Sequence, residues 1–297
     1  MTDRPLSGVL NIHKPSGMTS RDVVDVVKRL VRPARTGHAG TLDPLATGVL
    51  VVCVGSATRL IEYVQRQAKR YRATFLLGRS SPTEDVEGDV TMLADAPRPS
   101  INEIRAAAVR FTGEIMQRPP IFSALKVAGR RSYALARAGQ GVALAPRPIT
   151  IHAIEVIEYV YPELTLDIRC GSGTYVRSLG RDLAEAVGTA AVMSALVRTE
   201  IGEFHLTESC PCNGLQCESL VQFLRPPLEA IRNLPLVDLT EDQAVQVAQG
   251  RFVALPDVAP QTDGEWAAVS PTGKLVAILV PRGQGLFGAR LNLSGSG

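Results

Sequence analysis

The 297-residue sequence lacks the features of several broad protein classes. It has no run of 18 or more apolar residues, and its first residues, MTDRPLSGVL, lack the charged and apolar regions of a signal peptide. We therefore expect a cytoplasmic protein that does not associate with a membrane. Its five cysteines, an odd number in a chain of this length, indicate reduced thiols and not a disulfide framework.

The sequence also lacks a Walker loop, the glycine motif that binds nucleotide phosphates. We expect a reaction that needs no cofactor. One group of metal-ligand residue types is present, namely His205, Cys210, Cys212 and Cys217. Its C-x-C-x4-C spacing is not that of a usual zinc ribbon, and such residues often simply pack, so we predict no metal site.

Acidic residues are scarce where the chain is most basic. Residues 1–150 hold 22 Lys and Arg against 12 Asp and Glu, whereas residues 151–297 hold 10 against 17. No acid lies between Glu114 and Glu155, and the six cations and two aromatic residues there are Arg118, Phe122, Lys126, Arg130, Arg131, Tyr133, Arg137 and Arg147. Cations bind phosphates, and aromatic rings stack on unpaired bases. A solvated loop is the alternative, but such loops usually mix charges, so this segment favours nucleic-acid binding.

Helical and strand patterns alternate irregularly along the chain. Ser20 is expected to cap a helix with the sequence RDVVDVVKRLV, and Ser100 and Glu103 form a capping box for the helix INEIRAAAVRF. The unbroken apolar run at residues 49–54 predicts a strand buried on both faces. Because the order is irregular and includes hairpins, the predicted fold class is α+β with a mixed sheet.

Proline-rich segments after Arg232 mark a domain boundary. We predict a large domain over residues 1–232, with the basic insert at about 115–150, and a small β-rich domain over residues 233–297.

The most informative segment is GHAGTLDPLATG, residues 37–48. It contains one carboxylate, Asp43, which is framed by glycines and followed by Pro44. Glycines let backbone approach a large substrate closely, and a proline stiffens the loop, so that the acid keeps one direction. Such an acid suits a nucleophile or a lone base. Asp-Pro is also ordinary turn chemistry, and the spacing alone favours this simpler interpretation.

Position by position, this segment resembles the signature loop of the TruB family of pseudouridine synthases. Other blocks resemble family motifs in the same order: Lys14–Ser20, Lys69–Arg72, Pro119–Lys126, Gly173–Arg177, Ser194–Thr199 and Ile201–Phe204. The resemblance implies the pseudouridine synthase fold, which is a mixed central sheet with flanking helices. It also implies that residues 1–232 are the catalytic domain and that residues 233–297 form a PUA-like domain.

The resemblance implies three catalytic residues. Asp43 would attack C1′ or C6 of the target nucleotide or assist a glycal route, and these alternatives stay open. Tyr71 would lie against the uracil and handle the proton at C5. Arg177 would pair with Asp43 and keep it ionised. By residue type alone, an ordinary strand start with a surface tyrosine is the favoured interpretation of Tyr71. Arg177 could be a surface residue, but an arginine in the first turn of a helix opposes the helix dipole, which indicates a specific partner.

Further residues are implied to bind the substrate. Leu196 would pack under the flipped base, His38 would enter the space that the base vacates, and Lys14 would support the wall of the site. Residue type alone is equally consistent with a core leucine and a hydrogen-bonded loop histidine. The cations implied to grip the RNA are Lys126, Arg130, Arg131 and Arg137.

The function that the resemblance implies is isomerisation of a uridine to pseudouridine in the T-arm of tRNA, at position 55 in the TΨC loop. The uracil–ribose bond is cleaved, the base rotates, and a C–C bond forms. We expect an isomerase that acts as a monomer without guide RNA, because the guide-dependent relatives usually carry basic extensions that this chain lacks. A hydrolase of nucleosides or glycosides is one alternative, although it normally needs two carboxylates. The other is an RNA-binding or tRNA-folding module without catalysis.

Overall fold

The structure, a computed structural model, describes residues 6–122, 126–127, 130–131, 144–256 and 264–294. The chain divides into two compact units, which are described separately. Unit 1 consists of Met1–Asp43, Val49–Gln65 and Glu203–Gly297, and unit 2 consists of Pro44–Gly48 and Arg66–Gly202.

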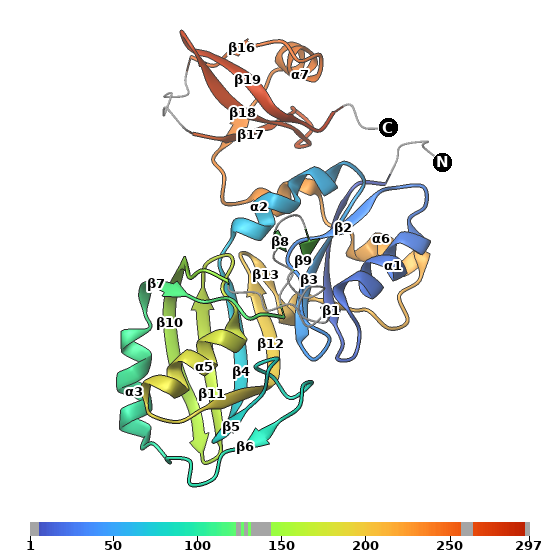
Figure 1. The fold of residues 1–297 in the computed structure, drawn as a ribbon. Coiled ribbons are helices and arrows are strands. Elements are labelled where there is room, and N and C mark those ends of the chain that lie inside the picture. Colours follow the sequence, from blue (N-terminus) through green and yellow to red (C-terminus); the bar gives the residue numbers. More distant parts are fainter. Residues whose placement is uncertain (1–5, 123–125, 128–129, 132–143, 257–263, 295–297) are drawn as a thin grey trace. The chain divides into compact units, whose positions relative to one another are not determined.

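Unit 1 contains a sheet with the strand order β14-β1-β3, in which β2 also pairs with β3 (Figure 1). These strands are β1 (Gly8–Lys14), β2 (Thr36–His38), β3 (Thr47–Val54) and β14 (Cys210–Pro211). The accompanying helices and short strand are α1 (Ser20–Leu30), η1 (Gly55–Leu60), α2 (Ile61–Arg66), β13 (Phe204–His205), η2 (Leu206–Glu208), α6 (Cys217–Phe223) and η3 (Pro227–Ile231). Residues 49–54 are fully buried, as the apolar run predicts.

Helix α1 packs one apolar face on this sheet. Val23 and Val27 belong to one buried cluster with Leu10 of β1 and Leu50 of β3. Valines have low helix propensity, so tertiary burial of this face is what stabilises the helix. The helix therefore fixes the segment that precedes it against the sheet.

The cap of α1 differs from the prediction. Thr19 is the N-cap residue: its side chain accepts a hydrogen bond from the Asp22 backbone, and Asp22 accepts one from the Thr19 N–H in return. The assignment of Ser20 as the cap is wrong, because the Ser20 hydroxyl is buried and bonds to a distant loop. Two adjacent residues of capping type make this ambiguous from local sequence.

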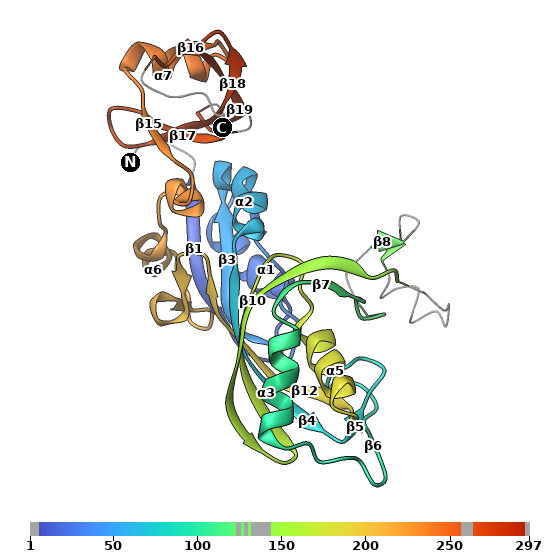
Figure 2. The same cartoon turned by 90° about the vertical axis from the view of Figure 1, so that its left-hand side faces the viewer.

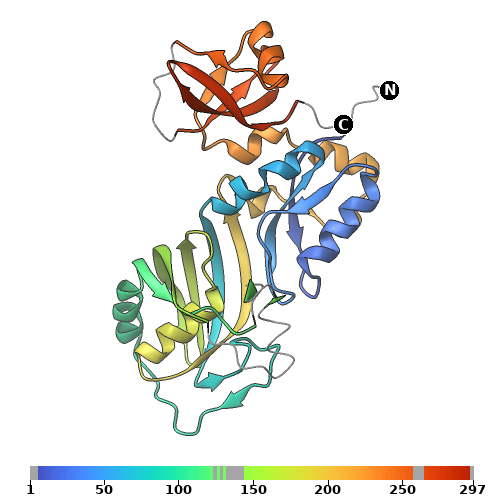
Figure 3. The ribbon, with the colours of Figure 1, turned by 45° about the horizontal axis from the view of Figure 1, so that its top comes forward.

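The C-terminal part of unit 1 has a five-stranded sheet of its own, orange and red in Figure 3. The strand order is β15-β17-β18-β19-β16. Its elements are β15 (Leu236–Asp238), α7 (Glu241–Ala248), β16 (Val253–Ala254), β17 (Trp266–Val269), β18 (Leu275–Gly283) and β19 (Leu286–Asn292). Trp266 and Phe287 meet edge to face in its core, with ring centroids 5.3 Å apart. The chain thus ends in a β-rich segment with its own core, while the predicted boundary after residue 232 stays a prediction.

Unit 2 contains the strand order β12-β4-β11-β10-β7, with antiparallel neighbours throughout. Its strands are β4 (Lys69–Leu77), β5 (Arg79–Ser80), β6 (Thr91–Met92), β7 (Gly113–Gln117), β8 (Lys126–Val127), β9 (Arg130–Arg131), β10 (Arg147–Val160), β11 (Glu163–Cys170) and β12 (Ala191–Ile201). Thr47 and Gly48 of β3 pair with β12 in parallel, so the sheet is mixed and the predicted α+β class is confirmed.

Two helices, α3 (Ile101–Arg110) and α5 (Val176–Ala186), cover one face of the sheet in unit 2 (Figures 1 and 2). The predicted Ser100–Glu103 capping box of α3 is present. A Cβ atom on Gly180 of α5 would lie 2.0 Å from the ring of Phe75, so a glycine lets this helix approach β4 closely. Phe75 lies four residues after Tyr71 on β4, so the two side chains point to the same face of the sheet. Because α5 packs against Phe75, it covers the face that carries Tyr71.

Candidate functional site

The loop that carries Asp43 is held by buried hydrogen bonds to α1. The Ser20 hydroxyl accepts a bond from the Leu42 N–H (2.8 Å) and donates one to the Leu42 carbonyl (3.1 Å). Leu42 itself is buried, whereas Asp43 is half-buried. One side chain thus satisfies both backbone groups of the residue before the acid. Ser20 is a supporting residue that sequence reasoning missed, because its hydroxyl had been assigned to the helix cap.

Glycines allow the two ends of this loop to turn. Gly40 and Gly48 have φ values of +98° and +104°, a region that side-chain-bearing residues rarely adopt. A Cβ atom on Gly48 would lie 2.2 Å from the Arg198 carbonyl oxygen. Only glycine therefore fits where β3 meets β12. His38, on β2, is half-buried and pairs with Val52 of β3.

Lys14 is buried completely at the end of β1. Its ammonium group donates hydrogen bonds to the carbonyls of Pro15 and Met18. The lysine therefore fixes the turn that leads into α1, and through α1 it contributes to the support of the Asp43 loop. Its contact with substrate stays a prediction.

In unit 2, Tyr71 and Leu196 lie on one face of the sheet. Leu196 of β12 is opposite Ala73 of β4, and Arg198 is opposite Tyr71. Residues opposite each other in an antiparallel pair point to the same face, so Tyr71, Leu196 and Arg198 share the face covered by α5. Tyr71 and Leu196 are only 8% and 7% exposed, which excludes the surface-tyrosine interpretation.

Arg177 lies in the first turn of α5 and is also buried, with 7% exposure. Its guanidinium forms an ion pair with Asp85 (3.3 Å) and donates hydrogen bonds to the carbonyls of Thr83 (2.6 Å) and Phe122 (3.2 Å). The surface interpretation is therefore wrong for Arg177. A planar guanidinium held by several acceptors keeps a fixed direction. The pairing of Arg177 with Asp43 stays a prediction.

Asp85 is the acid that sequence reasoning missed. It is 3% exposed, and its other carboxylate oxygen accepts bonds from the Thr83 hydroxyl (2.6 Å) and the Glu87 N–H (3.1 Å). The sequence around it is acidic and rich in turn residues, which resembles a solvated loop. Nothing in that local pattern distinguishes Asp85 from its exposed neighbours.

The acid that precedes Asp85, Glu84, also holds α5. It accepts a hydrogen bond from the Ser178 hydroxyl (2.6 Å) and pairs with Arg181. Its φ of +63° is unusual for a non-glycine residue, and the backbone there pairs with Met193 of β12. Burial raises the pKa of Glu84 above its usual value, although Ser178 and Arg181 oppose that rise. The loop before residue 90 is therefore part of the support of α5.

The structure describes the backbone of three of the four predicted RNA-gripping cations. Lys126 belongs to β8 and Arg130 and Arg131 to β9, and these two short strands pair with each other. Arg137 lies outside the described residues. Their contacts with RNA stay predictions.

The cysteines of the possible zinc group pack with apolar residues. Cys210 and Cys212 are buried in the cluster beneath α1, whereas Cys217 is exposed. Burial raises the pKa of the Cys210 thiol to about 11. In the described part of the chain, no three His, Cys, Asp or Glu residues are grouped as metal ligands would be.

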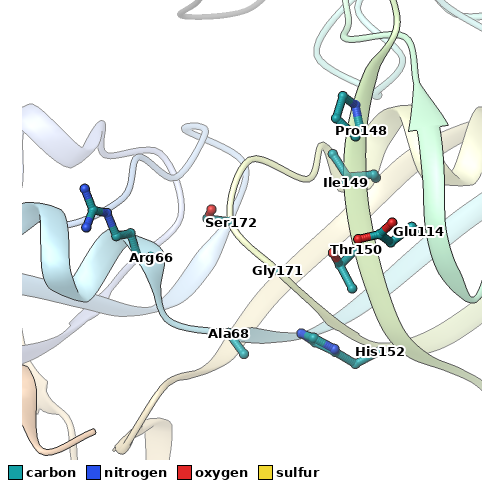
Figure 4. A pocket seen from close by; sticks show the side chains of 9 residues that line it. All are labelled: Arg66, Ala68, Glu114, Pro148, Ile149, Thr150, His152, Gly171 and Ser172. Carbon is teal, nitrogen blue, oxygen red and sulfur yellow. The ribbon is translucent and has the colours of Figure 1, made fainter. Parts of the chain in front are cut away.

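Unit 2 also contains an open polar pocket of about 350 Å³ (Figure 4). Its lining residues are Arg66, Ala68, Glu114, Pro148, Ile149, Thr150, His152, Gly171 and Ser172. The predicted catalytic residues are not among them. Among the helices in the part of the chain that is described, none has the length and apolar character needed to span a bilayer.

Comparison with known proteins gives consistent matches over the chain. A family model described as TruB family pseudouridylate synthase (N terminal domain) matches residues 28–176, and one described as tRNA Pseudouridine synthase II, C terminal, matches residues 234–287. The chain is 42% identical over 291 residues to tRNA pseudouridine synthase B of Arthrobacter sp. (strain FB24), with 94% of each chain covered. It is 42% identical over 279 residues to tRNA pseudouridine synthase B of Cutibacterium acnes, with 93% of each covered.

A solved structure of a Cbf5-Nop10-Gar1 complex contains a similar chain. The TM-score is 0.71 at 27% sequence identity, with 92% of this chain and 78% of that chain covered. The similarity therefore includes the arrangement of the backbone as well as the sequence motifs.

Proposed function

Because the chain belongs to the TruB family of pseudouridylate synthases, we propose that it isomerises a uridine in the T-arm of tRNA, at position 55, to pseudouridine. The observation that carries the proposal is the loop in which Ser20 fixes the backbone immediately before Asp43. A single carboxylate on a backbone held in this way is suited to covalent or electrostatic catalysis at one atom.

Asp43 is the residue to which we assign the chemistry. It attacks C1′ or C6 of the target nucleotide or assists a glycal route, and each of these requires the ionised carboxylate. Arg177 supplies the positive charge that keeps Asp43 ionised. The burial of the Arg177 guanidinium supports this role, because a charge in a low-dielectric environment acts strongly on its neighbours.

Tyr71 and Leu196 are proposed to hold the extruded uracil. The phenol of Tyr71 stacks against the ring and handles the proton at C5, and Leu196 packs under the flipped base. Their common face on β4 and β12 supports a joint role. His38 fills the space that the base leaves in the RNA.

We propose that the protein acts alone in the cytoplasm, as a monomer without guide RNA. The basic segment between Glu114 and Glu155 supplies cations for the tRNA backbone, so a guide is not needed for affinity. The C-terminal segment from residue 234 contains four basic and six acidic residues, and we assign it a docking or stabilising role.

A tritium-release assay tests the function. Purified protein is incubated with a tRNA transcript labelled at C5 of its uridines, without any other RNA or protein. Release of one tritium per tRNA is expected, because the new C–C bond at C5 displaces that hydrogen. A matched transcript with cytidine at position 55 should release none. Free uracil would instead indicate a hydrolase, and binding without product would indicate a non-catalytic module.

A further inference from the structure

The residues just before α5 form a turn whose position is set from outside the helix. Tyr175 is the N-cap residue of α5, but its side chain makes no capping hydrogen bond. Gly173, two residues earlier, has a φ of +83°. Arg177 follows two residues after Tyr175, so any displacement of this turn moves the Arg177 guanidinium.

Gln117, the last residue of β7, holds this turn with its side-chain amide. Its Nε2 donates a hydrogen bond to the Tyr175 carbonyl (3.0 Å), and its Oε1 accepts one from the Tyr175 N–H (2.9 Å). Gln117 is completely buried. The Tyr175 carbonyl also accepts the first bond of the helix, from the Leu179 N–H (3.0 Å), so both of its lone pairs are used. The amide thus holds the N-cap residue of α5 by both of its backbone groups.

Arg147, the first residue of β10, holds the same turn. It lies opposite Gln117 in the β7–β10 pair. Its guanidinium donates a hydrogen bond to the Gly173 carbonyl and lies over the Tyr175 ring, 5.1 Å from the centroid. The basic insert leaves the sheet after Gln117 and returns to it at Arg147.

Helix α5 also bonds to the first residues of the insert. Arg181 donates a hydrogen bond to the Arg118 carbonyl (3.1 Å), and Arg177 donates one to the Phe122 carbonyl (3.2 Å). Side chains of β7 and β10 therefore bond to the turn before α5, and side chains of α5 bond to the residues that follow β7. A change at the root of the insert is transmitted to Arg177 through these hydrogen bonds, and those at Tyr175 and Phe122 are partly buried, which makes them more costly to break.

We propose that Gln117 is a positioning residue for Arg177, and that it links the root of the RNA-gripping insert to the catalytic centre. This inference rests on the proposed function, because it requires Arg177 to take part in turnover. The side chain of glutamine is suited to the role since it presents one donor and one acceptor at the spacing of a peptide group. An Asn side chain is one methylene shorter, and Met has similar length without these groups.

The test uses Gln117→Met, Arg177→Lys and the double variant in single-turnover assays on labelled tRNA. Gln117→Met should slow turnover about 10- to 100-fold, as is typical for a displacement of about 1 Å. Its affinity for tRNA should change less than about 3-fold. In the Arg177→Lys background, the same change should add little, because its effect passes through Arg177.

Gln117→Glu provides a second readout. At neutral pH its carboxylate keeps the acceptor for the Tyr175 N–H but opposes the Tyr175 carbonyl oxygen. Protonation at lower pH restores the donor, so the rate relative to wild type should rise as the pH falls. Arg147 faces this position from β10 and stays charged throughout, and Gln117→Met should show no such rise.

Some outcomes would overturn the inference. Wild-type turnover of Gln117→Met would do so, as would equal losses in affinity and turnover, or full additivity with Arg177→Lys. These outcomes differ from a failure of the proposed function, in which wild-type protein makes no pseudouridine or Arg177→Lys turns over normally.

Discussion

Buried charged side chains are concentrated in unit 2. Arg177 and Asp85 are 7% and 3% exposed, and Lys69 and Arg198 are 7% and 1% exposed. Removing a charge from water is costly unless hydrogen bonds and opposite charges compensate. Arg177 and Asp85 compensate each other directly, which is consistent with an arginine whose position is fixed before substrate binds.

Asp43→Asn should abolish turnover while tRNA binding is retained. The substitution keeps the size of the side chain but removes the charge that attacks or stabilises the developing positive charge on the sugar. Single-turnover tritium release and filter binding on the same tRNA measure the two properties. Asp43→Glu should fare almost as badly, because the added methylene moves the oxygens by about 1 Å. Substantial product from the Asn variant would contradict the assignment of Asp43.

Lys69 should make stability depend on pH. Burial, with a smaller contribution from the Arg198 charge, lowers the pKa of Lys69 from 10.5 to about 8. Between these values the unfolded state binds more protons than the folded state, so the free energy of unfolding rises with pH. Relative to Lys69→Met, wild type should gain about 2–3 kcal/mol between pH 7.5 and 10. Urea denaturation at both pH values measures this, and a constant difference would show that Lys69 titrates normally.

At the scale of elements, the start of α1 has two separate tasks. Thr19 caps the helix, and Ser20 holds the loop before Asp43. Thr19→Ala should therefore lower the free energy of unfolding by about 1 kcal/mol and leave turnover nearly unchanged. Ser20→Ala leaves the buried N–H of Leu42 without that partner, so turnover should fall at least 10-fold along with a loss of about 1–3 kcal/mol in stability. Thermal melts and tritium release separate the two variants, and equal turnover in both would refute the role of Ser20.

Local sequence predicted individual elements better than it predicted their contacts. The Ser100–Glu103 box was identified because both partners lie within one turn. Residues 49–54 were identified because burial on both faces requires an unbroken apolar run. The Arg177–Asp85 pair and the Gln117–Tyr175 bonds join residues that are far apart in the chain, and no periodicity reports such contacts.

At the scale of the whole molecule, the division into units is the feature least evident from sequence. The boundary falls between Asp43 and Pro44, inside the segment of residues 37–48, which is one continuous motif in the sequence. Compact units are defined by contacts between distant segments, and unit 1 is assembled from three separate stretches of chain. Composition changes along the chain identified the proline-rich region after Arg232 but carry no signal for a boundary of this kind.

Positive charge is concentrated in the basic insert, whereas the catalytic acid Asp43 lies outside it. Substitutions in the insert should therefore change the affinity for tRNA without changing the chemical step. Replacing Arg130, Arg131 and Arg137 with Gln should weaken tRNA binding and reduce the slope of log K against log salt by about 2–3, because fewer counterions are released. A matched control replaces the C-terminal cations Arg251, Lys274 and Arg282, which are all exposed, and removes the same charge. That control should leave the slope nearly unchanged.

Filter binding at several salt concentrations gives the slopes, and turnover at saturating tRNA should persist in both triple variants since Asp43 is intact. An unchanged slope in the insert variant would mean that these cations do not contact the RNA backbone, and equal slope changes in both variants would mean that net charge alone determines affinity.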